Sequence, residues 1–133
     1  MNRKMSRTEL RKIILENINL LEESANIKLN DYPGILNSIA GFLGRLDLFL
    51  KNYQVYTRRP WRSDPRTRKI TAPYADLQNQ MQGEKDASMI RMCLDSIRRE
   101  INKNFTGRGK HQELIGLATS IINRISEIES KSM

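Results

Sequence analysis

The sequence predicts an all-α protein, an antiparallel four- or five-helix bundle with a long basic loop between its second and third helices. Four stretches place apolar residues three or four positions apart, which is the spacing of amphipathic helices. No stretch keeps the strict alternation that is typical of a half-buried strand. The 133 residues suit a single helical domain, residues 1–133, that buries one hydrophobic core.

The first helix is expected from about residue 7 to 24. Ser6 and Glu9 have the spacing of a capping box, in which each side chain accepts a hydrogen bond from the backbone N–H of the other residue. An apolar stripe follows at helical spacing and predicts the face that packs on the other helices. Its members are Leu10, Ile13, Ile14, Ile18 and Leu21.

The second helix is expected from residue 33 to 54, because Pro33 suits a first helical turn. It also carries a strip of small residues, Ala40, Gly41 and Gly44. Since small residues let helices approach closely, we expect this strip to pack inside the bundle, with a homodimer contact as the alternative. The apolar stripe of this helix comprises Ile35, Leu36, Ile39, Leu43, Leu46, Phe49, Leu50 and Tyr53.

A third helical segment begins at Thr71 or Ala72, and its register fails around Gly83. Glycine favours a break, so the segment is expected to divide or bend between Gln82 and Lys85. The glycine-rich stretch 106–110 ends the segment, and a last helix follows. The residues that we expect to be buried in the bundle are Ile39, Leu43, Leu46, Ile97, Ile101, Ile121 and Ile125.

The expected loop, about residues 54–72, contains the strongest charge in the chain. Residues 51–69 hold seven basic side chains against one acid, Asp64, and so supply +6 of a net charge of +8. Arginines can contact phosphate or carboxylate groups, while Trp61 or Tyr56 could stack on a base. The alternative is a solvated linker whose Trp61 folds back onto the helices. The basic residues are Lys51, Arg58, Arg59, Arg62, Arg66, Arg68 and Lys69.

The N-terminal region adds a second basic cluster, because residues 3–12 carry a net charge of +4. In a chain that runs up and down, the second helix returns to the end where the first began. Arg7 and Arg11 would then lie at the same end as the basic loop. This arrangement predicts a strongly cationic pole.

Catalysis and metal binding find little support in the sequence. The single histidine, His111, and the single cysteine, Cys93, lie far apart and form no zinc motif, and His111 is expected at the surface. The acids do not converge at helical spacing. We therefore expect no enzyme activity, no metal and no cofactor.

The sequence also indicates where such a protein would work. It lacks a secretory signal and a run of apolar residues long enough for a transmembrane segment. One cysteine permits no internal disulfide, which suits a reducing compartment. We expect a cytoplasmic protein.

A basic chain of this kind favours an acidic partner. We expect nucleic acid, with RNA or another single strand favoured. A protein adaptor or inhibitor that docks on an acidic protein surface is the alternative, as is a matrix-like protein on an anionic membrane. The expected contact residues are Arg58, Arg59, Trp61, Arg62, Arg66, Arg68 and Lys69, joined by Arg7 and Arg11.

Overall fold

The computed structural model describes residues 27–107 and 109–131. The first expected helix, about residues 7–24, lies outside them, together with Arg7 and Arg11. The described residues contain no strand, and Lys28 and Asp86 form one isolated β-bridge. Their helices are η1 (Leu29–Asp31), α2 (Pro33–Thr57), η2 (Arg68–Ile70), α3 (Thr71–Gln82), α4 (Ala87–Asn104) and α5 (Lys110–Lys131).

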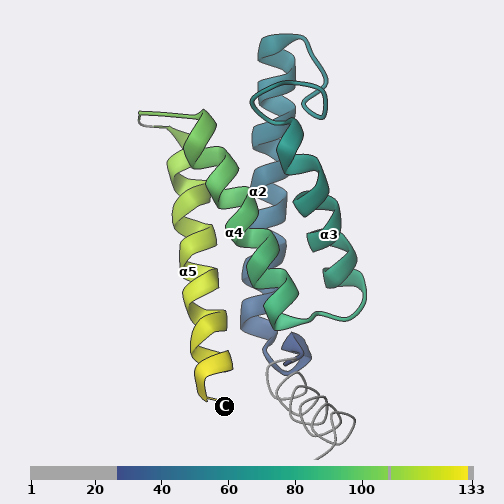
Figure 1. Ribbon diagram of the computed structural model, residues 1–133, viewed down its shortest axis with the longest axis vertical. Helices are drawn as coiled ribbons and strands as arrows, with labels where there is room; N and C mark the ends of the chain where they lie inside the picture. Colours follow the sequence, from purple (N-terminus) through teal and green to yellow (C-terminus); the bar gives the residue numbers. More distant parts are fainter. Residues whose placement is uncertain (1–26, 108, 132–133) are drawn as a thin grey trace, which may run out of the picture.

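Successive α-helices run in opposite directions (Figure 1). α4 packs against both α3 and α5, and α2 packs against α5. The α2–α3 connection and the α4–α5 turn therefore lie at one end of the molecule, whereas the α3–α4 turn and η1 lie at the other (Figure 1). This arrangement brings segments that are far apart in sequence to the same end.

The core lies between the four α-helices. α2 directs Ile39, Phe42 and Leu46 inward, and all three are fully buried. The prediction of burial is confirmed for six of the seven core residues named from the sequence, whereas Leu43 is only partly buried. Leu43 lies at the edge of the stripe because its neighbour Phe42 takes the inward position. The six confirmed residues are Ile39, Leu46, Ile97, Ile101, Ile121 and Ile125.

The predicted break in the third helical segment is confirmed. α3 ends at Gln82, and α4 begins at Ala87. Asp86 caps α4, because its carboxylate accepts a hydrogen bond from the Met89 backbone N–H at 3.0 Å. The bond satisfies one of the N–H groups that a helix start leaves without a partner.

The expected packing of the small-residue strip inside the bundle is wrong. Ala40, Gly41 and Gly44 are exposed, and a Cβ added at either glycine would meet nothing within 4 Å. The larger residues Ile39 and Phe42 occupy the inward face of α2, which turns the strip outward. The homodimer contact stays a prediction.

The expected surface position of His111 is also wrong, because its side chain is only 7% exposed. Its Nε2 lies 3.1 Å from the Gly107 carbonyl oxygen, and its ring packs beside that of Phe105. His111 therefore fills the space beneath the α4–α5 turn.

None of the helices in the described ranges combines the length and the apolar character that crossing a membrane requires.

Candidate functional site

The connection between α2 and α3 is a compact series of turns, in place of the long loop expected from about 54 to 72. α2 continues to Thr57, and η2 occupies residues 68–70. We call residues 58–69 the arginine turn. Within it the Asp64 carbonyl accepts hydrogen bonds from the N–H groups of Thr67 and Arg68, at 3.1 and 2.7 Å. These bonds give the turn a defined backbone.

Trp61 is the apolar anchor of the arginine turn. It is 3% exposed, and its ring centroid lies 5.5 Å from that of Tyr74 on α3. Its backbone N–H donates to the Gln54 side-chain oxygen at 3.0 Å, while the Arg62 guanidinium lies 4.4 Å from its ring centroid. Stacking on a base would need an open ring face, so the burial speaks against that role. The linker interpretation anticipated this inward orientation.

Asp64 is the polar anchor of the turn and is 4% exposed. Its Oδ1 accepts hydrogen bonds from the Tyr53 hydroxyl at 3.0 Å and from the Arg66 backbone N–H at 2.9 Å. Burial, and then the nearby Asp64 carboxylate, raise the pKa of Tyr53. The fully buried Thr67 hydroxyl donates to the Trp61 carbonyl at 2.6 Å. Asp64, the only acid among residues 51–69, is thus held within the fold.

Arg58 ends α2 in the left-handed region, at φ 60° and ψ 30°, and its N–H donates to the Gln54 carbonyl at 2.8 Å. Left-handed backbone costs a residue with a Cβ roughly 1–2 kcal/mol, which is why glycine is the usual choice here. The chain therefore places an arginine where the backbone favours glycine.

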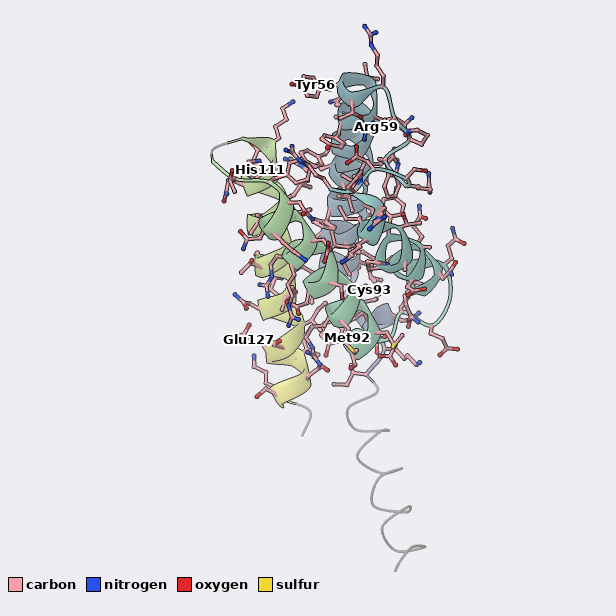
Figure 2. All side chains as sticks on the ribbon, turned by 45° about the horizontal axis from the view of Figure 1, so that its top comes forward. Tyr56, Arg59, Met92, Cys93, His111 and Glu127 are labelled. Atoms are coloured by element: carbon pink, nitrogen blue, oxygen red, sulfur yellow. The ribbon has the colours of Figure 1, made fainter. Side chains whose placement is uncertain are left out.

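Six cationic side chains of the arginine turn are exposed, and within the described ranges no acidic side chain forms a salt bridge with any of them. Lys51 differs, because it pairs with Asp47 at 2.9 Å. Figure 2 shows Arg59 and Tyr56 at the same end of the molecule. The six are Arg58, Arg59, Arg62, Arg66, Arg68 and Lys69.

Two depressions lie along the C-terminal half of α2. The larger, which we call the α2–α5 groove, has a volume of about 490 Å³ and a mainly apolar lining. The smaller, of about 380 Å³, is lined by residues that include Arg59 and Arg66. Tyr53 lines both, so the two depressions share a wall. The α2–α5 groove is lined by Arg45, Leu48, Phe49, Asn52, Tyr53, Tyr56, Lys110, Glu113 and Leu114.

Tyr56 was the alternative to Trp61 as a stacking residue, and it is 86% exposed. It stands at the α2–α5 groove, which sequence reasoning did not find. The period of α2 already placed Leu48, Asn52 and Tyr56 on one face, four residues apart. Lys110 carried no such signal, because only the packing of α5 against α2 brings it to the groove.

Nowhere in residues 27–107 and 109–131 do three potential metal ligands from His, Cys, Asp or Glu gather. Burial raises the pKa of the Cys93 thiol to about 11, with a smaller effect from Asp76, so this thiol is a poor nucleophile at neutral pH.

Comparisons of the chain with protein-family models, curated proteins and solved structures found no match.

Proposed function

We propose that the protein is a non-catalytic nucleic-acid-binding protein and that its favoured ligand is single-stranded RNA. The observation that carries this proposal is the arginine turn, whose backbone is anchored by the buried Trp61 and Asp64. Its six cationic side chains are exposed and have no acidic partner among the described residues. Arginine matches phosphate oxygens with paired N–H donors, so the turn would contact the backbone of the strand.

Two features favour a single strand over a duplex. An unpaired base can stack on an aromatic side chain, and Tyr56 is 86% exposed beside the arginines. The depressions next to the turn could also accept groups that a duplex keeps stacked inside. We also expect Arg7 and Arg11 to contact phosphates of the strand.

A second candidate is a protein adaptor or inhibitor that docks on an acidic protein surface. It is favoured by the exposed apolar side chains Leu48 and Val55, which are 56% and 77% exposed on α2. Protein interfaces often combine arginines with such side chains and with tyrosine. In this case the arginines would be hot spots for one acidic partner, and generic RNA would bind weakly.

The decisive experiment is a titration of labelled single-stranded RNA at two or more salt concentrations. The wild type is compared with a variant in which Arg58, Arg59 and Arg62 are replaced by alanine. Binding through phosphates releases counterions, so affinity should fall linearly on a log-log salt plot. The variant should bind more weakly, with a slope flatter by about one unit for each lost phosphate contact.

A matched control removes the same charge elsewhere, by replacing Lys85, Arg124 and Lys131 with alanine. Arg124 and Lys131 are exposed on α5, and Lys85 is half-buried in the α3–α4 turn. The control should bind RNA much as the wild type does. Equally weak binding by all three proteins would end the nucleic-acid proposal and favour the adaptor.

A further inference from the structure

We propose that the α2–α5 groove is a nucleobase subsite, which takes unstacked bases of the strand whose phosphates contact the arginine turn. This inference rests on the proposed function and adds the residues that would hold the bases. The groove, at about 490 Å³, has the size of a small-molecule site.

The wall of the groove is aromatic and is fixed by packing. The rings of Phe49 and Tyr53 both meet Phe105 of α4 edge to face, with centroid distances of 5.1 and 5.3 Å. Leu114 contributes an apolar side chain from α5. Because these rings are held by the core, a base could enter without first ordering them, which lowers the cost of binding.

Tyr56 supplies the exposed ring. It is 86% exposed, and Figure 2 shows it standing at the end of α2 on the side toward α5. A base that stacks one face on this ring would have its other face free to contact the groove. Stacking of this kind is tolerant of sequence, since every base has a flat aromatic face.

The polar groups of the groove suit a nucleotide. The Asn52 amide offers both a donor and an acceptor, which is what the edge of a base requires. Arg45 and Lys110 add two cations, and Glu113, 3.8 Å from Arg45, offsets part of that charge. The wall of the groove is thus apolar, and the charged residues of its lining carry a net positive charge.

The two depressions adjoin each other at Tyr53, which lines both. Arg59 and Arg66 line the smaller one and could hold phosphates, while the larger one holds bases. A polymer that repeats flat apolar groups and anionic groups matches both. This pairing of an apolar groove with neighbouring arginines favours a nucleic acid over an apolar peptide, which would use the groove without the arginines.

The test uses two labelled RNA oligomers of equal length, one fully base-bearing and one with abasic central nucleotides. Both carry the same phosphates, so the arginine turn should bind both. The wild type should prefer the base-bearing oligomer by about 5- to 150-fold, the range expected for one stacked base. Tyr56→Ala should remove this preference and leave the salt slope unchanged, whereas Tyr56→Phe should keep it. Asn52→Ala should reduce it.

The outcomes separate the subsite from the proposed function. If the wild type and Tyr56→Ala bind both oligomers equally, while the arginine variant loses binding, the subsite is wrong and RNA binding stands. If no oligomer binds with an arginine-dependent slope, both proposals fall. An acidic amphipathic peptide that binds through Leu48 and Tyr56, with no preference among the RNAs, would assign the groove to a protein partner and overturn the subsite. Because Tyr56 is exposed, its replacement should leave folding intact.

Discussion

The Tyr53 hydroxyl donates a hydrogen bond to the Asp64 carboxylate at 3.0 Å and thereby joins α2 to the arginine turn. The same carboxylate oxygen accepts from the Arg66 backbone N–H, at 2.9 Å. Asp64 therefore shapes the turn from within and forms no salt bridge with its arginines. An acid that would lower the charge of the surface instead holds that surface in place.

Replacing Tyr53 with phenylalanine should destabilise the protein by roughly 1–3 kcal/mol, because the buried Asp64 carboxylate loses one of its donors. Urea denaturation followed by circular dichroism measures the free energy of unfolding. Tyr56→Phe is the matched control, since that side chain is 86% exposed, and it should change stability little. Equal stability of the two variants would contradict an anchoring role for Tyr53.

Stability should also fall at alkaline pH through Tyr53. Burial and Asp64 raise its folded-state pKa above the usual 10.0. The contribution of Tyr53 to the free energy of unfolding is therefore complete below about pH 10, and it is lost as the pH rises through the folded-state pKa. The free energy of unfolding, measured from about pH 8 to 11, should decline more steeply for the wild type than for Tyr53→Phe. Parallel curves would exclude Tyr53 as the titrating group.

Arg58→Gly should separate stability from binding. Glycine relieves the left-handed backbone but loses more freedom on folding, so the free energy of unfolding should stay within about 1 kcal/mol of the wild type. RNA affinity should nevertheless fall, with a salt slope flatter by about one unit. Thermal unfolding and an RNA titration on the same sample check both results. Unchanged affinity would remove Arg58 from the site.

The packing of α5 is tested by Ile121→Ala. Ile121 is 2% exposed, so the substitution should cost roughly 2–5 kcal/mol as a buried large-to-small change. Ser120→Ala, one residue away on the exposed face of the same helix, is the control and should be close to neutral. A loss for Ile121→Ala that lies within experimental error would mean that α5 packs differently.

Cys93 should report global unfolding. Its thiol is buried, with a pKa of about 11, so at pH 8 it is protonated and shielded from reagents. An aromatic disulfide reagent should react slowly with native protein, at a rate that rises with urea in step with the unfolded fraction, and at once with denatured protein. Rapid reaction under native conditions would show that α4 opens locally around Cys93.

Helix type and order followed from the sequence, as the stripe of α2 and the break near Gly83 illustrate. The period of an apolar stripe depends only on neighbouring residues, so it can be read before the fold is known. The end of α2 was placed three residues early, at 54 instead of Thr57. Glycine does not mark this end, because the residue in left-handed conformation is Arg58, and Pro60, two residues later, is the stop signal that the sequence carries.

The sequence by itself determined that this protein is helical and that its positive charge gathers between residues 51 and 69. Only the tertiary structure decided which of those residues face solvent. Trp61 turned inward to pack on Tyr74 of α3, and Asp64 turned inward to accept a hydrogen bond from Tyr53 of α2. The arginines stayed exposed, since burying an unpaired charge is costly. The α2–α5 groove likewise needed the packing of two helices that are distant in sequence. Local sequence patterns determine whether a segment is helical, whereas burial and long-range contacts determine which groups its side chains contact.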